Sequence, residues 1–115
     1  MKVFSVPAEV MCDPQLNITS ILERRCADTT NPLLYRWQMS PGNWQPGRAR
    51  EFRAMVVAVA KGLIASGIVP GDRIGIMSRT RFEWTLIDFA IWYAGAVSVP
   101  VYETSAPAQA AWALS

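Results

Sequence analysis

The feature that most constrains this chain is a pair of short apolar runs, residues 73–77 and 97–101, with one helical stretch, residues 81–94, between them. Turn-forming residues bound both runs, so each is expected to be a strand, and the first to be buried. Strands joined through a helix lie parallel, with a right-handed crossover. Parallel sheets carry more than two strands and are covered on both faces. We therefore expect an incomplete parallel-sheet unit, the opening section of a larger α/β domain whose closing strands this chain does not contain.

The stretch before the first strand has the spacing of an amphipathic helix over residues 50–66. Its apolar side chains recur at helical intervals and are Phe52, Met55, Val56, Val59, Ala60, Leu63 and Ile64. Gly67 can take the left-handed conformation that ends a helix. Pro70 and Gly71 then fit the central positions of a type II turn. This helix is expected to pack against the parallel unit.

Capping signals place the remaining helices. Thr80 and Glu83 have the spacing of a capping box at the start of the helix between the strands, and Gly95 is the natural end of that helix. Ser105 and Pro107 fit the N-cap and first position of a last helix that runs to residue 114. The expected order is helix, strand, helix, strand, helix.

A small β-hairpin precedes this unit. Residues 33–38 alternate in character, and residues 40–43, Ser-Pro-Gly-Asn, supply turn chemistry before the next strand. The hairpin aromatics are expected to cover the core or an edge. Residues 1–31 lack sustained periodicity, apart from a short helix expected over 20–26, and form a lead-in segment. Residues 32–115 form the α/β domain, which we interpret as partial.

Composition excludes several classes of function. The chain has no histidine, which removes Ser-His-Asp and Cys-His triads and the usual zinc sites. Eleven Lys and Arg against nine Asp and Glu give a net charge of +2. These charged residues are scattered along the chain rather than clustered, which argues against nucleic-acid binding. Cys12 and Cys26 have no CxxC spacing, so two free thiols in a reducing cytosol are expected, with one disulfide as the alternative.

One stretch, residues 84–102, is apolar enough to raise the question of a membrane span. Asp88 argues against a span, because a carboxylate at mid-span costs about 2.5–3.5 kcal/mol on insertion scales. The first seven residues also do not form a signal peptide. We expect no transmembrane segment and a cytoplasmic location, with peripheral association with a membrane as an alternative.

Polar side chains follow each expected strand. Ser78, Arg79, Thr80 and Arg81 come after the first strand and at a helix start, where open α/β sheets bind ligands and anions. Helix capping with two solvated arginines is the competing explanation. Glu103 follows the second strand without a second acid or a base to pair with. The sequence also lacks GxxxxGK[ST] and GxGxxG, so we predict no catalytic, cofactor-binding or metal-binding residue in this chain.

Three segments carry a resemblance to a known family. They are Gly67-Ile68-Val69-Pro70-Gly71-Asp72-Arg73, Ser78-Arg79-Thr80-Arg81-Phe82-Glu83-Trp84 and Val99-Pro100-Val101-Tyr102-Glu103-Thr104. With them, residues 32–115 resemble the N-terminal part of the AMP-binding domain of long-chain fatty-acid–CoA ligases of the actinobacterial type, members of the adenylate-forming superfamily. The first motif recurs across the superfamily, and the other two are more selective for the long-chain branch.

The resemblance implies a two-step ligase. ATP and a fatty acid give an acyl-adenylate and pyrophosphate, and the CoA thiol then displaces AMP, with Mg²⁺ assisting the first step. The phosphate loop, the adenine and magnesium motifs, the hinge and the catalytic lysine of that family all lie beyond the segment that this chain resembles. The chain alone is therefore expected to be inactive and to bind none of ATP, Mg²⁺ or CoA.

One departure from the family concerns the helix of residues 50–66. Relatives tend to have Thr three residues before Glu51, whereas this chain has Arg48 there. The loss of a capping hydroxyl predicts a frayed helix start, at about 1 kcal/mol.

Two alternatives to a truncated ligase stay open. The chain can be an interaction module that docks through its open sheet edge onto a separately encoded remainder of the synthetase. It can also be a small independent α/β binding domain, which would unfold in a sharp cooperative transition.

Overall fold

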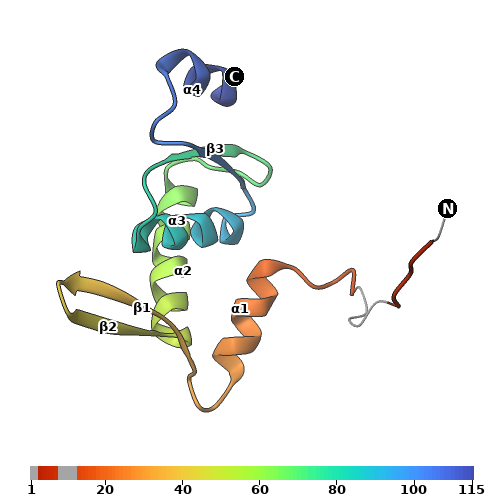
Figure 1. The fold of residues 1–115 in the computed structure, drawn as a ribbon, viewed down its shortest axis with the longest axis vertical. Helices are drawn as coiled ribbons and strands as arrows, with labels where there is room; N and C mark the ends of the chain where they lie inside the picture. Colours follow the sequence, from red (N-terminus) through yellow and green to blue (C-terminus); the bar gives the residue numbers. More distant parts are fainter. Residues whose placement is uncertain (1–2, 8–12) are drawn as a thin grey trace.

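A computed structural model describes residues 3–7 and 13–115. Its elements, in chain order, are α1 (Ile18–Ala27), β1 (Leu33–Ser40), β2 (Asn43–Arg48), α2 (Ala49–Ala65), β3 (Arg73–Met77), α3 (Phe82–Tyr93), β4 (Val97–Val101) and α4 (Pro107–Leu114). Figure 1 shows the β1–β2 hairpin and the β3–β4 pair near opposite ends of α2, with α4 beyond the pair. The expected α/β class, hairpin and element order are confirmed.

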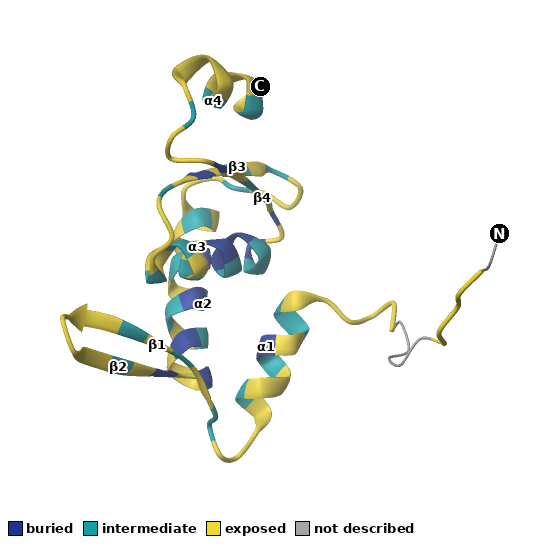
Figure 2. Ribbon diagram, in the orientation of Figure 1, coloured by how far each residue is buried: buried dark blue, intermediate teal, exposed yellow. Residues whose placement is uncertain are grey.

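The strands β3 and β4 pair in parallel, as the helical connection predicted. Arg73 lies opposite Val97 at one end of the pair, and Met77 lies opposite Val101 at the other. The expectation of a buried first strand is wrong, because in β3 only Ile76 is buried and Met77 is 51% exposed. Within the described residues this sheet has two strands, so each keeps an unpaired edge, and Figure 2 shows much of the pair exposed.

Gly75 lies in β3 where another chain segment packs closely. A Cβ built on this glycine would lie 2.5 Å from Cδ2 of Leu114, at the end of α4. The lack of a side chain therefore lets α4 approach the sheet.

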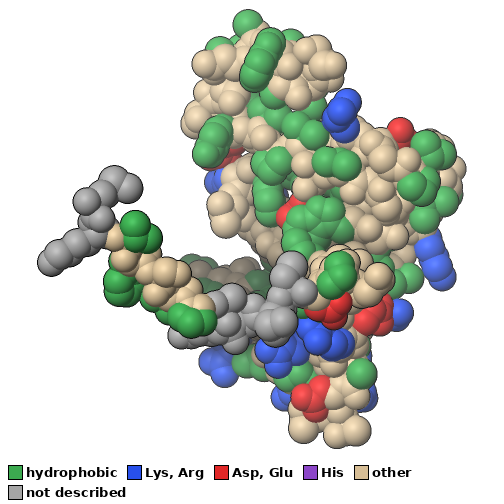
Figure 3. Space-filling model, turned by 90° about the vertical axis from the view of Figure 1, so that its right-hand side faces the viewer, with side chains coloured by type: hydrophobic (Ala, Val, Ile, Leu, Met, Phe, Trp, Pro, Cys, Tyr) green, Lys and Arg blue, Asp and Glu red, His purple; other side chains and the backbone are tan. Residues whose placement is uncertain are grey.

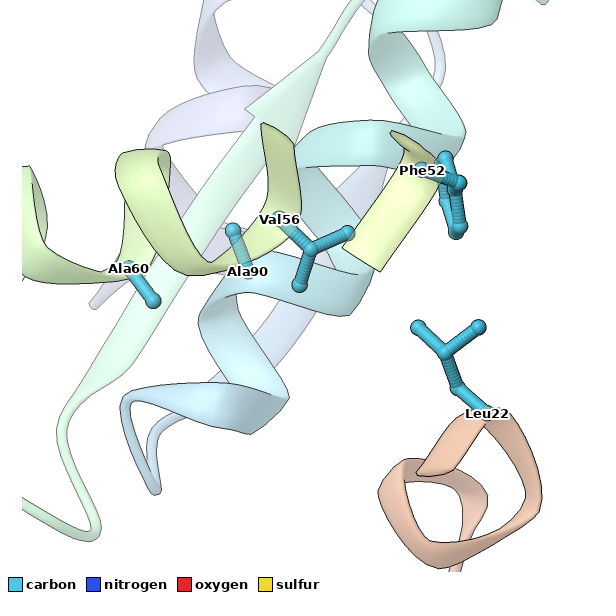
Figure 4. Packing of buried hydrophobic residues seen from close by; sticks show 5 residues of the cluster. All are labelled: Leu22, Phe52, Val56, Ala60 and Ala90. Carbon is cyan, nitrogen blue, oxygen red and sulfur yellow. The ribbon is translucent and has the colours of Figure 1, made fainter. Parts of the chain in front are cut away.

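The helix α2 organises the main core. Its buried side chains meet residues of α1 and α3 in a cluster formed by Leu22, Phe52, Val56, Ala60 and Ala90, drawn in Figure 4. The helix ends as predicted, with Gly67 at φ +99°. The following turn also matches, because Gly71 has φ +93° and the Asp72 amide donates to the Val69 carbonyl at 3.1 Å. The Asp72 carboxylate accepts from the Val69 amide at 2.9 Å, which is turn chemistry.

The start of α2 is capped by a residue that sequence reasoning missed. Arg48 makes no side-chain cap, as expected. The prediction of fraying is nevertheless wrong, because Asn31 Oδ1 accepts from the Arg50 amide at 3.0 Å and Asn31 Nδ2 donates to the Glu51 carboxylate. The Pro32 carbonyl also accepts from the Ala49 amide at 3.1 Å. Two of the free amides at this helix start are thus satisfied from the loop between α1 and β1.

The two other predicted N-caps are also wrong. The N-cap of α3 is Arg81 rather than Thr80, so Glu83 has no capping hydroxyl opposite it, and Arg81 forms no side-chain cap. The N-cap of α4 is Ala106 rather than Ser105, although Pro107 does stand in the first turn. There Gln109 Oε1 accepts from the Ala106 amide at 3.0 Å, which supplies half of a capping box.

The helix α1 confirms the short helix expected near residues 20–26. Asn17 caps it, because its side chain accepts from the Ser20 amide at 2.8 Å. Leu22 is 3% exposed in the core cluster, so α1 packs onto the domain, whereas residues 3–7 are exposed. The boundary at residue 31 between the lead-in segment and the α/β domain stays a prediction. Of the two cysteines, Cys26 is a free thiol, and Cys12 lies outside the described residues.

Three polar side chains from three helices meet beside the core. The Arg53 guanidinium donates to Glu23 at 2.7 and 2.8 Å, and the Tyr93 hydroxyl donates to the same carboxylate at 2.9 Å. Partial burial tends to raise the pKa of Glu23, but the bonds from Arg53 and Tyr93 outweigh it and lower the pKa. The triad therefore joins α1 to α2 and α3.

The apolar stretch of residues 84–102 is divided between α3 and β4. Among the described residues, no helix has the length and apolar character needed to cross a bilayer.

Candidate functional site

The carboxyl ends of β3 and β4 bring both predicted polar segments to one place. Because Met77 and Val101 lie opposite each other in the parallel register, the residues that follow them leave the sheet at the same edge. Ser78, Arg79 and Thr80 come from one side, and Tyr102 and Glu103 from the other. The sequence therefore predicted correctly that these segments share a sheet edge.

These residues surround a cleft of about 360 Å³, which we call the strand-end cleft. Its lining consists of Ser78, Arg79, Thr80, Trp84, Pro100, Val101, Tyr102 and Glu103. One cation and one carboxylate thus lie on the same cleft. Glu103 opposes anion binding beside Arg79, and this makes the cleft a poor site for a multiply charged anion.

Arg81 does not join Arg79 in this cleft. Its guanidinium binds Glu83 through Nε at 2.6 Å and through Nη2 at 2.7 Å. The hydrogen bonds from Arg81 lower the pKa of Glu83 to about 2. A paired anion site built from Arg79 and Arg81 therefore has no support in the structure, because Arg81 lines a different hollow and is already neutralised.

The chemistry available in the strand-end cleft is limited. The Ser78 hydroxyl donates to the Arg79 carbonyl at 3.1 Å, so no base activates it. Glu103 is exposed and has no second acid beside it in the cleft. Among residues 3–7 and 13–115, no group of three His, Cys, Asp or Glu is placed to hold a metal ion. The residues of the cleft do not fit ATP or Mg²⁺. The expectation that this chain supplies no catalytic, cofactor-binding or metal-binding residue stays a prediction.

A larger hollow, which we call the aromatic groove, lies between the hairpin and the start of α3. Its volume is about 780 Å³, and Arg81 and Thr80 lie on its rim. Trp37 stacks on Phe82 at 5.1 Å between ring centroids, and Tyr35 meets Phe52 edge to face at 5.2 Å. These contacts confirm the expected core cover for Tyr35 and Trp37, whereas Trp44 is 55% exposed.

Tyr35 is the polar exception in that groove lining. Its hydroxyl oxygen is buried and has no hydrogen-bond partner among the described residues. Desolvation, with a smaller contribution from the charge of Glu51, raises the pKa of Tyr35 to about 12. Its ring lies against Gly47, where a Cβ would meet ring atoms at 2.2 to 2.7 Å. Sequence reasoning missed this groove, since the approach of the hairpin to α3 has no local signal.

A third hollow, of about 560 Å³, lies beside β4 and α4. It is lined by Pro100, Val101, Tyr102, Ser105, Ala108, Gln109, Trp112 and Ala113. Tyr102 is 86% exposed and Trp112 82% exposed, which is unusual for aromatic side chains of this size. Figure 3 shows hydrophobic side chains spread over the upper part of one face of the molecule. Exposed apolar side chains thus gather around this hollow.

Comparison with known proteins gives a consistent result. The family described as AMP-binding enzyme matches residues 34–115. Long-chain-fatty-acid–CoA ligase FadD15 of Mycobacterium tuberculosis is 37% identical over 114 residues, which cover 99% of this chain and 19% of FadD15. The chain thus spans about a fifth of the length of this curated relative.

Solved structures show the same fold. The fatty acid AMP ligase from Legionella pneumophila superposes with a TM-score of 0.68 at 19% identity, over 76% of this chain and 15% of the ligase. The N-terminal subdomain of Klebsiella oxytoca NpsA, solved with 3-hydroxyanthranilyl-AMSN, superposes with a TM-score of 0.72 at 20% identity, over 84% of this chain and 24% of the subdomain.

Proposed function

Because the chain belongs to the AMP-binding enzyme family, we propose that it supplies the N-terminal scaffold of a long-chain fatty-acid–CoA ligase. The observation that carries this proposal is the 37% identity to FadD15 over 99% of the chain. In the proposed reaction, ATP activates a fatty acid as an acyl-adenylate, and CoA then takes the acyl group. The chain contributes folded framework to this reaction, and the reacting groups come from the rest of the enzyme.

The exposed apolar surface supports a role as scaffold. The chain has an accessible surface of 8855 Å², whereas a compact monomer of 12.7 kDa has about 6,200 Å². Part of the excess comes from the extended residues 3–7, and part comes from Tyr102, Trp112 and the open β3–β4 pair. Surface of this kind is buried when further strands and helices pack on it.

A chimera tests this proposal. The chain replaces the 114 matched residues of FadD15, and acyl-CoA formation from palmitate, ATP and CoA is measured. We expect the chimera to retain activity, and FadD15 without those residues and the isolated chain to have none. A folded but inactive chimera would contradict the proposal, and acyl-CoA formation by the isolated chain would contradict its role as scaffold.

The unpaired strand edges favour a second arrangement, in which the chain docks onto a separately encoded remainder of a synthetase. Co-expression of the chain with FadD15 lacking the matched residues tests this arrangement. Co-purification with restored activity would support it, and separate elution would count against it.

We also place this function in the cytoplasm, where ATP and CoA are available to a ligase. Cell fractionation with and without a high-salt wash tests this location. Recovery in the soluble fraction is expected, and recovery in the membrane fraction that salt releases would instead indicate peripheral association with a membrane.

A further inference from the structure

Asp88 is a buried acid for which the described part of the chain supplies no ion-pair partner. It is 8% exposed on α3, and its Oδ1 is buried without a hydrogen bond. After Glu83 in the first turn, Asp88 is the one charged residue of this helix. A buried carboxylate without a donor is strongly unfavourable, and most buried acids are paired.

Two arginines of the chain are engaged in other ion pairs. Arg81 binds Glu83, and Arg53 binds Glu23. Arg79 lies on the strand-end cleft, where it forms no ion pair within the described part of the chain. The described residues therefore do not supply the donor that Asp88 needs.

Two open hollows flank Asp88 along α3. Residues four apart share a face of a helix, so Trp84, Asp88 and Trp92 form one stripe. Trp84 lines the strand-end cleft. Trp92 lines a hollow of about 390 Å³, together with Gly95, Ala96 and the first residues of α1. Asp88 lines neither hollow, but it lies between Trp84 and Trp92 on this stripe, so a polypeptide segment that fills both hollows would follow the stripe past Asp88.

We propose that Asp88 anchors the remainder of the ligase through a cationic side chain, an arginine or a lysine, on a segment that packs along this stripe. The inference rests on the proposed function and names the chemistry of its docking contact. A cation supplies both the hydrogen bonds and the opposite charge that a buried carboxylate requires. Asp88 is thus unfavourable in the isolated chain and favourable in the assembled enzyme.

The test compares the same substitutions in two backgrounds, the isolated chain and the FadD15 chimera. Asp88→Asn keeps the shape and removes the charge, and Asp88→Leu removes all polar character. Glu103→Gln is the matched control, because it removes the same charge from an exposed position. Urea unfolding gives the ratio of folded to unfolded protein, and resistance to limited proteolysis replaces it where the isolated chain has no cooperative transition.

We expect opposite signs in the two backgrounds. Both Asp88 variants should raise the folded-to-unfolded ratio of the isolated chain at least 3-fold, and lower that of the chimera at least 10-fold. Glu103→Gln should change neither by more than 2-fold. If Asp88→Asn stabilises the chimera, or leaves it unchanged while wild-type chimera is active, the inference is wrong and the proposed function stands. If the wild-type chimera folds without activity, the inference and the proposed function are both wrong.

Discussion

At the scale of single residues, remote side chains complete structures that local sequence leaves unfinished. Asn31 has φ +47°, a left-handed conformation that asparagine tolerates better than most residues. In this conformation the side-chain oxygen of Asn31 accepts from the backbone amide of Arg50, and its side-chain nitrogen donates to the Glu51 carboxylate. The hydrogen bonds to Asn31 lower the pKa of Glu51. One residue outside α2 thus organises the first turn of that helix.

Substitution of Asn31 should separate its two contributions. Asn31→Gly removes the side-chain hydrogen bonds and keeps the backbone relaxed, and we expect a loss of about 1 kcal/mol in the free energy of unfolding. Asn31→Ala should lose more, because alanine also strains the left-handed backbone. Urea unfolding of both variants checks the order. A smaller loss for alanine than for glycine would contradict the strained conformation.

The Glu23 carboxylate should make stability depend on pH. Its pKa is lower in the folded chain than its ordinary value of 4.5, since the bonds from Arg53 and Tyr93 outweigh desolvation. The stabilisation that ionised Glu23 gives the folded chain is therefore present above about pH 4.5, and it is lost as the pH falls through the lower pKa of the folded state. Urea unfolding between pH 7 and pH 3 should show a smaller decrease for Glu23→Gln than for the wild type. An identical decrease would show that the triad does not contribute.

At the scale of elements, glycines mark where two segments approach and where none does. Gly47 in β2 lies under the Tyr35 ring, which Phe52 and Phe82 hold from other sides. Gly62 lies in α2 with open space around it. The first glycine is required by packing, and the second only weakens a helix.

Alanine at these two glycines should have opposite effects. Gly47→Ala forces the Tyr35 ring out of its aromatic contacts, and we expect a loss of about 1–3 kcal/mol in the free energy of unfolding. Gly62→Ala should raise it by about 0.5–1 kcal/mol, because alanine favours the helix. Thermal unfolding followed by circular dichroism measures both. Equal destabilisation by the two variants would argue against the hairpin position described above.

The sequence predicted elements far better than contacts between them. Gly67, Gly71 and Gly95 locate the ends of α2, the turn and α3, because a positive φ is a local requirement that glycine meets. The cap from Asn31 and the burial of Leu22 depend on how distant segments pack, and no local pattern carries that information.

The candidate site was likewise predicted in part. Parallel pairing brought residues 78–80 and 102–103 together, as the rule for strand ends requires. Arg81 diverged, because its extended backbone, with ψ 169°, precedes a helix that begins one residue later than expected. Its pairing uses Glu83, a side chain that the expected capping box had assigned to a backbone amide.

At the scale of the whole molecule, the chain has a well-packed centre and an exposed apolar periphery. The cluster around Val56 is buried from three helices, whereas the β3–β4 pair and α4 leave large apolar side chains exposed. For example, Trp112 keeps 82% of its surface exposed. Such a surface favours association with any apolar partner, including a second copy of the chain.

Substitution of Trp112 should therefore change association more than stability. We expect Trp112→Gln to change the free energy of unfolding by less than about 0.5 kcal/mol, as exposed positions usually do. The variant should self-associate less than the wild type in sedimentation velocity experiments over a range of concentrations. Phe52→Leu, in the buried cluster, is the control and should lower stability without reducing association. Equal association of Trp112→Gln and the wild type would contradict this account of the surface.

The bond between Glu23 and Tyr93 joins residues 70 positions apart. During synthesis, which runs from the N-terminus, α1 leaves the ribosome well before α3 exists to receive it. The contact between Glu23 and Tyr93 can therefore form only after the chain between them has been made, whereas Leu22 can meet its partners Phe52 and Val56 of α2 earlier.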